Sequence, residues 1–195
     1  MNQEVVGMPI VNDLLKEQSL TRYKLSKISD VPQTTIRDIC SGKAELGKCT
    51  AETVCKIARA LNTTVETLVS YYDRPNFEAF KSNVCHKVKI KGDLDFIIET
   101  LESGEIRKLH QKRWCLESLY LLAMVDYLSR ENGLPVCLEY NDLRKLKFSE
   151  TVYPGGVLIK CLAAGNDDAK EESIKDAILE FMRFNIVEGE VRSVC

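Results

Sequence analysis

The chain has 195 residues, enough for one ordinary domain or for a small domain followed by a medium one. Its 45% hydrophobic content excludes a disordered protein. Its formal net charge of -2 excludes a strongly basic surface, so any nucleic-acid binding must come from a local patch. No apolar run is long enough to span a membrane, and no signal peptide is readable. Eight scattered cysteines without a Cys-x-x-Cys pair indicate reduced thiols, so we expect a cytoplasmic protein without membrane partners.

The pattern of hydrophobic residues divides the chain into two regions. Helical periodicity continues to about Tyr72, and Pro75 then interrupts it because proline cannot continue a helix. We therefore expect one domain at residues 1–72 and a second at residues 73–195. Between Thr21 and Lys48 six basic residues accompany three acidic ones, so the local positive charge of the first domain gathers there.

Five short helices are predicted in the first region from apolar residues spaced three and four apart. Thr21 is the expected N-cap of the second helix. Thr63 is the expected N-cap of the fifth, and Glu66 completes a capping box with it. The predicted ranges are Met8–Gln18, Thr21–Ile28, Pro32–Cys40, Thr50–Leu61 and Thr64–Tyr71.

The second and third of these helices are spaced as a helix-turn-helix, in which two helices crossing at a steep angle share one small core. The expected core residues are Leu25, Val31, Ile36 and Ile39. Such a motif leaves the N-terminal end of its second helix exposed, and in DNA-binding versions that end enters the major groove. A glutamine there can pair with N6 and N7 of adenine, and a threonine can meet a polar base edge or a thymine methyl. The Gln and Thr after Pro32 therefore stand where DNA would be read.

The segment TRYKLSKISDVPQTTIRDICSGK, residues 21–43, resembles the phage-repressor-like (XRE or Cro/CI) helix-turn-helix family. The segment TVCKIARALNTTVETLV, residues 53–69, is similar to the following helices of that family. The resemblance covers residues 8 to about 70. It implies a mainly α protein with an N-terminal five-helix repressor-like DNA-binding domain. The implied function is that of a sequence-specific transcriptional regulator, expected to be a repressor that can control its own promoter.

The resemblance also implies which residues contact an operator of double-stranded DNA. The base-reading residues are Gln33, Thr34, Arg37 and Asp38. The residues at phosphate-contacting positions are Arg22 and Lys43. Thr21 joins them because it lies with Arg22 at a helix N-terminus, where backbone N–H groups favour an anion. Phosphate contacts position the protein but do not read sequence. We expect a homodimer, because one head reads only a half-site.

Three residues depart from the family pattern. Asp30 stands at the usual turn glycine; it tolerates left-handed geometry but adds negative charge near the DNA backbone. Pro32 replaces the usual Ser or Thr cap and offers no capping oxygen. Ser26 replaces a small alanine at the helix contact. An alternative stays open, in which the motif has this shape but binds only protein and Gln33 and Thr34 are ordinary solvated residues.

The second region is predicted to be mainly helical. Its longest helix, Arg113–Asn132, is apolar nearly all round, so we expect it at the centre of the domain. The segment Tyr153–Gly156 is interpreted as a turn, and the tail FNIVEGEVRSV as a strand or extended arm. The other expected helices are a short one beginning at Phe77, Asp93–Ser103 with Asp93 as the cap, a short one from Asn141, and Asp168–Phe184. Leu94, Ile97, Ile98 and Leu101 are expected to face inward.

No catalytic or metal site is predicted in the second region. Cys85 and His86 suggest a nucleophilic dyad, but neighbours in sequence rarely present their side chains to each other. Two histidines, His86 and His110, without a close cysteine pair do not make a zinc site. We expect no enzyme activity and no cofactor.

The layout of a repressor-like head with a compact helical body resembles small bacterial regulators that pair with a toxin and repress their own operon. The resemblance implies an alternative function as the antitoxin of a toxin–antitoxin pair, whose second domain neutralises a toxin enzyme. Otherwise this domain would serve in dimerisation. The candidate partner contacts are Phe181, Phe184, Ile186 and Val187. The alternative is that these four side chains belong to the core.

Overall fold

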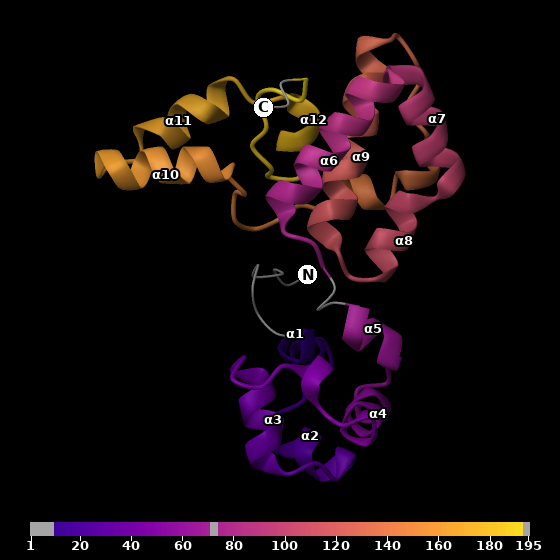
Figure 1. The fold of residues 1–195 in the computed structure, drawn as a ribbon, viewed down its shortest axis with the longest axis vertical. Helices are drawn as coiled ribbons and strands as arrows, with labels where there is room; N and C mark the ends of the chain where they lie inside the picture. The colour runs from indigo at the N-terminus through magenta and orange to yellow at the C-terminus, as the bar shows by residue number, and fades with distance from the viewer. Residues whose placement is uncertain (1–9, 71–73, 193–195) are drawn as a thin grey trace. The chain divides into compact units, whose positions relative to one another are not determined.

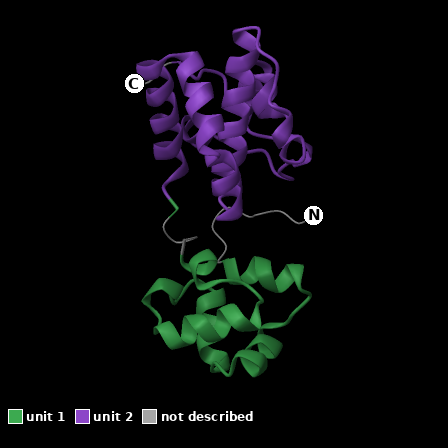
Figure 2. Cartoon of the chain, turned by 90° about the vertical axis from the view of Figure 1, so that its right-hand side faces the viewer, with its two compact units in different colours: residues 1–74 green, residues 75–195 purple. Residues whose placement is uncertain are grey.

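The computed structural model describes residues 10–70 and 74–192. In these residues α-helices connected by short loops make up most of the chain (Figure 1). The chain forms two compact units, Met1–Arg74 and Pro75–Cys195 (Figure 2), and each unit has its own hydrophobic core. The boundary expected at residues 72–73 lies outside the described residues. The predicted mainly α fold class is confirmed.

Unit 1 contains the five predicted helices. They are α1 (Ile10–Glu17), α2 (Arg22–Ser29), α3 (Gln33–Cys40), α4 (Ala51–Ala60) and α5 (Val65–Ser70). A short 3-10 helix, η1 (Leu46–Lys48), lies between α3 and α4. Met8, Pro9 and Tyr71, at the ends of two predicted helices, lie outside the described residues.

The helix starts of unit 1 follow the capping residues, with one correction. Thr21 caps α2 by accepting a hydrogen bond from the Lys24 N–H at 3.1 Å, as predicted. The predicted cap of α5, Thr63, is wrong by one residue. The hydroxyl of Thr64 accepts from the Thr67 N–H at 3.1 Å, so the capping box with Glu66 does not form.

The core of unit 1 is made by the apolar faces of all five helices. The predicted helix-turn-helix core is confirmed: Leu25, Val31, Ile36 and Ile39 are each at most 3% exposed. They pack with apolar residues of α1, α4 and α5 in a single cluster. Burial of this stripe, more than intrinsic propensity, stabilises helices of only six to ten residues.

Unit 2 is a bundle around one central helix. Its elements are α6 (Phe77–Lys91), α7 (Asp93–Ser103), α8 (Glu105–Gln111), α9 (Cys115–Glu131), the 3-10 helices η2 (Leu138–Tyr140) and η3 (Leu143–Lys145), α10 (Gly155–Ala164), α11 (Asp168–Lys175) and α12 (Leu179–Met182). Helix α9 is buried along most of its length and packs against α6, α7, α8 and α12. Its central position, predicted from its apolar circumference, is confirmed.

Several predictions for unit 2 are wrong at the level of single elements. Asp93 is the first residue of α7, and Gly92 is its N-cap. Ile97 is buried as predicted, but Leu94 and Ile98 are 51% and 53% exposed, because α7 turns Phe96 inward in their place. Helix α8 was not expected. The helix predicted from Asn141 is replaced by the 3-10 helix η3, and a second one, η2, precedes it.

Two further corrections concern segments that depend on distant parts of the chain. The segment Tyr153–Gly156 leads into helix α10, whose first N–H, that of Gly155, donates to Glu78 Oε1 on α6 at 3.1 Å. The helix predicted over residues 168–184 is interrupted after Lys175. After this break the Ile178 N–H donates to the Glu188 carbonyl at 2.8 Å. This backbone hydrogen bond to the C-terminal segment stands in place of a bond within a continuous helix.

The predicted strand or arm at the C-terminus is an extended segment with one bridge. Ile186 pairs in parallel with Val152, and the Val187 N–H donates to the Val152 carbonyl at 2.8 Å. Ser193 and Val194 lie outside the described residues. In the part of the chain that the structure describes, no helix combines the length and apolarity that crossing a membrane requires.

Candidate nucleic-acid interface

Helix α3 separates a buried face from an accessible one. Ile36, Ile39 and Cys40 are buried in the core of unit 1. Positions 33, 34, 37 and 38 lie together on the other side of the helix, because residues three and four apart share a face. Gln33, Thr34 and Arg37 are exposed and Asp38 is half-buried. The fold thus brings all four predicted base-reading residues to one surface.

The N-terminal end of α3 has no side chain that caps it. Pro32 is the N-cap rather than the first helical residue, and no side chain accepts from the first-turn N–H groups. The first backbone bond of the helix runs from the Ile36 N–H to the Pro32 carbonyl at 3.1 Å. The N–H groups of Gln33 and Thr34 therefore extend toward solvent with the positive end of the helix dipole. This surface favours an anion such as a phosphate.

The turn between α2 and α3 accommodates two of the three departures from the family pattern. Asp30 adopts the left-handed conformation, with φ 52° and ψ 36°, where the family uses glycine. Lys56 Nζ of α4 lies 3.7 Å from Asp30 Oδ2 in an exposed ion pair and 2.9 Å from Glu52 Oε1. The Ser26 hydroxyl donates to the Val31 carbonyl at 2.7 Å, so the replacement of alanine adds a bond that fixes the turn.

A buried asparagine on α1 connects the two helices of the helix-turn-helix. Asn12 is 5% exposed, and its Nδ2 donates to the Cys40 carbonyl at the end of α3 at 2.7 Å. Its Oδ1 accepts from Arg22 Nη2, at the start of α2, at 3.4 Å. Asn12 thereby joins the end of α3 to the start of α2. Sequence reasoning did not identify Asn12, although a polar residue within the apolar run Ile10–Leu15 was the available signal.

The remaining predicted contact residues lie around the same surface. Thr21 is exposed, and its hydroxyl is engaged in capping α2. Lys43, after the end of α3, is exposed. Arg37 Nε lies 3.8 Å from Asp38 Oδ1 in an exposed ion pair, which contributes little to stability in water.

Comparison with known families gives a match over this unit. Residues 11–74 match the model of the Cro/C1-type HTH DNA-binding domain. Unit 1 belongs to the Cro/C1-type helix-turn-helix domains. The Cro/C1-type domain makes the chain a DNA-binding protein of the transcription-regulator type, with double-stranded DNA as its partner. No curated protein and no solved structure matches the chain.

The Cro/C1-type match ends where unit 1 ends, so unit 2 has to be interpreted from its own residues. Cys85 and His86 do not form a dyad. The Cys85 thiol is half-buried against Tyr120, with Sγ 3.8 Å from the hydroxyl oxygen, and His86 is exposed. Burial raises the pKa of the Cys85 thiol, which is the opposite of what a nucleophilic cysteine requires.

The structure corrects the prediction that four residues of unit 2 contact a partner. Phe181, Phe184, Ile186 and Val187 are each at most 2% exposed. Three of them belong to the core cluster around α9, and the ring of Phe181 lies 4.9 Å from that of Tyr120. Apolar side chains at this depth are core residues, which is the alternative that the sequence left open. They offer no surface to a toxin.

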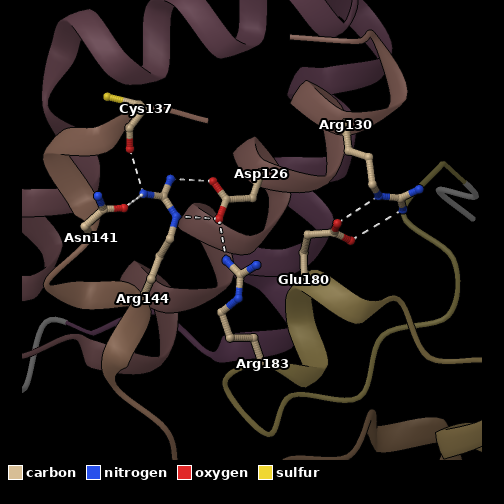
Figure 3. Close-up of polar contacts among 7 residues, drawn as sticks. All are labelled: Asp126, Arg130, Cys137, Asn141, Arg144, Glu180 and Arg183. Carbon is tan, nitrogen blue, oxygen red and sulfur yellow. Dashed lines mark hydrogen bonds and ion pairs between the residues drawn. The ribbon is translucent and has the colours of Figure 1, made fainter. Parts of the chain in front are cut away.

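A cluster of charged residues connects α12 to α9 (Figure 3). The carboxylate of Asp126, 1% exposed, accepts from Arg144 Nη2 and Nε at 2.7 and 2.8 Å and from Arg183 Nη1 at 2.9 Å. Arg130 Nε donates to Glu180 Oε1 at 2.8 Å. Arg144 is held in turn by the carbonyl of Cys137 and the Asn141 side chain. Because these groups already bond one another, the cluster is a structural connection, not a reactive site.

No group of three or more His, Cys, Asp or Glu side chains among residues 10–70 and 74–192 is arranged to hold a metal ion. All seven cysteines that the structure describes are free thiols. Burial raises the pKa of the thiol of Cys40, the last residue of α3, so this thiol acts as a small apolar core residue.

Proposed function

We propose that this protein is a sequence-specific transcriptional repressor that binds an operator through the exposed face of α3, and that its own promoter is among its targets. The observation that carries the proposal is the accessible, uncapped N-terminal end of α3 in an otherwise well-packed Cro/C1-type domain. An exposed glutamine, threonine and arginine on one such face have no role in the core of unit 1. They provide the donors and acceptors that base edges require.

Each side chain has a role that follows from its chemistry. Gln33 pairs with adenine through one donor and one acceptor, and Thr34 contacts a neighbouring base edge or a thymine methyl. Arg37 pairs with guanine O6 and N7 or with a phosphate, and Asp38 accepts from a cytosine N4 amine. The first-turn N–H groups of α3, with Arg22, Thr21 and Lys43, receive the phosphates on both sides of the groove.

A homodimer is part of the proposal. One α3 helix reads a half-site, and two half-sites about 34–36 Å apart give the specificity that a single head lacks. Antitoxin function is not included, since the four residues expected to contact a toxin are buried in the core of unit 2. We propose that the protein acts by binding and not by catalysis, in the cytoplasm, where a bacterial operator is found.

The test begins with the operator. Full-length protein selects binding sites from random double-stranded DNA, and the affinities for the selected site, the promoter of its own gene and unrelated DNA are measured. Gln33→Ala is expected to weaken specific binding by about 1–3 kcal/mol and to leave nonspecific binding nearly unchanged. Gln111→Ala, at an exposed glutamine of unit 2, is the matched control and should change neither. Equal losses on every DNA would exclude base reading by Gln33.

Phosphate contacts have a separate signature. Binding of the wild type should weaken steeply between about 50 and 200 mM salt, because each neutralised phosphate releases counterions. Lys43→Ala should weaken binding to all sequences to a similar extent and lower the slope of log affinity against log salt by about 0.9 per head. An affinity that is independent of salt and shows no preferred sequence would overturn the repressor proposal.

A further inference from the structure

Helices α10 and α11 form a hairpin that stands apart from the rest of unit 2. Gly165, in the left-handed conformation with φ 69°, ends α10 and turns the chain back. The two helices pack against each other, and neither makes a comparable contact with another helix of the unit. Figure 1 shows the hairpin projecting from the bundle formed by α6, α7, α8 and α9.

The sequence of α10 is that of a buried helix, yet the helix is at the surface. Its ten residues are GGVLIKCLAA, with a single charge, and only Cys161 is buried. Leu162 is 83% exposed and Ile159 is 67% exposed. Leu179, just after the hairpin, is 77% exposed. A helix that is apolar around most of its circumference normally lies inside a protein, so this surface is incomplete in a single chain.

The hairpin carries both halves of a complementary surface. A groove of about 490 Å³ lies beside α10 and α11, and Leu158, Leu162 and Gly165 are among the residues lining it. Ile159 stands next to this groove on the helix surface, with Leu162 one turn further along. A two-fold symmetric interface pairs the same patch of two copies, so it needs a projection and a recess on one surface. The α10–α11 hairpin provides both.

The charged residues of one hairpin also complement those of a second hairpin. Helix α10 has one charged residue, the exposed Lys160, and no acidic residue. Helix α11 has three acidic residues, Asp168, Glu171 and Glu172, and two lysines, Lys170 and Lys175, so its net charge is -1, and Glu171 and Glu172 are exposed. If two copies pair with their α10 helices antiparallel, the Lys160 of each copy can approach the exposed Glu171 and Glu172 of the other. A second copy therefore satisfies the apolar and the charged parts of the surface together.

We propose that the α10–α11 hairpin is the surface through which two copies of this chain associate. The hairpin spans residues 155–175 and supplies the central part of the interface, which takes about 20–30 residues from each copy. The inference rests on the proposed function, in which a repressor presents two α3 helices to two half-sites. Folding of unit 2 does not depend on the exposed residues of α10, so they can be changed without removing core contacts.

The mass of the full-length protein tests the proposal. Sedimentation velocity over a concentration series is expected to give twice the 22.1 kDa of one chain. Leu162→Glu should raise the dimer dissociation constant by about 30-fold or more, as expected for a central interface residue. Leu94→Glu is the matched control, since Leu94 is an exposed leucine on α7 and should leave the dimer intact. A wild type that stays monomeric, or a dimer unaffected by Leu162→Glu, would overturn the proposal.

A charge exchange tests whether the occupant is a second copy. Lys160→Glu should weaken self-association, and so should the double variant Glu171→Lys/Glu172→Lys, because each leaves like charges opposed. Mixing the two variants should restore a dimer of one chain of each kind. No such mixed dimer would form if the hairpin instead bound another protein, and that result would also overturn the proposal.

The two proposals fail in different ways. If hairpin variants leave the dimer intact while specific DNA binding still depends on Gln33, only the hairpin proposal fails. A dimer that depends on Leu162, with DNA binding indifferent to Gln33, would remove only the repressor proposal.

Discussion

The two units of this protein have apolar cores of the same kind but differ in the polar groups they bury. In the described part of unit 1 the buried polar side chains are Asn12 and Ser29, and both bond backbone carbonyls. Unit 2 buries several carboxylates, among them Asp126, Glu180 and Glu188. These three pair with arginines or lysines distant in sequence. Unit 1 is therefore specified largely by helical periodicity and caps, whereas unit 2 depends on long-range charge pairs.

The largest expected effect in this comparison comes from the buried carboxylate of unit 2. Asp126→Ala leaves Arg144, whose side chain is 10% exposed, without its charge partner. Removing one member of a buried pair costs about 3–5 kcal/mol of unfolding free energy. Trp114, the only tryptophan in the chain, lies in unit 2, so urea unfolding followed by its fluorescence reports on this unit.

The control for that experiment is Asp176→Ala, at an exposed aspartate after α11. It should change the free energy of unfolding by less than about 0.5 kcal/mol. Hydrogen exchange of the unit 1 helices should be the same in both variants. Equal effects of the two substitutions would contradict the idea that the Asp126 pairs specify unit 2.

A smaller effect is expected at a helix start in unit 1. Thr64→Ala removes the oxygen that accepts from the Thr67 N–H and should cost about 1 kcal/mol, seen as faster hydrogen exchange in α5. Thr63→Ala is the matched control, because Thr63 has no capping bond to α5, and its effect should be clearly smaller. A larger effect at Thr63 would restore the capping box expected from the sequence.

The smallest expected effect is a pH dependence in unit 2. Burial, with a further contribution from the Arg107 charge, lowers the pKa of His110 below its ordinary value of 6.5. The unfolded chain therefore binds this proton more readily than the folded one. The stability that neutral His110 provides is present above pH 6.5 and is lost as the pH falls through the lower pKa of the folded state.

This prediction is checked by urea unfolding at a series of pH values. His110→Gln should reduce the loss of stability below pH 6.5, and His86→Gln, at an exposed histidine, should not. A wild type whose stability rises between pH 6.5 and pH 5 through His110 would contradict the assignment.

The sequence predicted unit 1 well because its signals are local. The period of apolar residues gave all five helices, and Thr21 gave the start of α2. The prediction of Thr63 as the cap where the structure has Thr64 concerns adjacent threonines, between which periodicity cannot decide. The exposure of Gln33 and Thr34 also followed from the pattern, since the buried positions of α3 leave them on the other face.

The errors in unit 2 lie where a distant residue decides the local structure. Glu78 supplies the acceptor at the start of α10, which the sequence alone presented as a turn. The Glu188 carbonyl accepts from the Ile178 N–H, and the expected long helix ends before this residue. Which side of α7 faces inward was decided by packing against α9, because apolar residues occur on more than one face of α7.

By itself the sequence determined the helix-turn-helix of unit 1 and the residues on the exposed face of α3, because both follow from spacings within a few turns. The tertiary structure alone decided that Phe181 and Phe184 are core and that Asp126 is held by two arginines. It alone also decided that the apolar helix α10 is left uncovered. Burial depends on which segments meet in space, and for unit 2 those segments lie far apart along the chain.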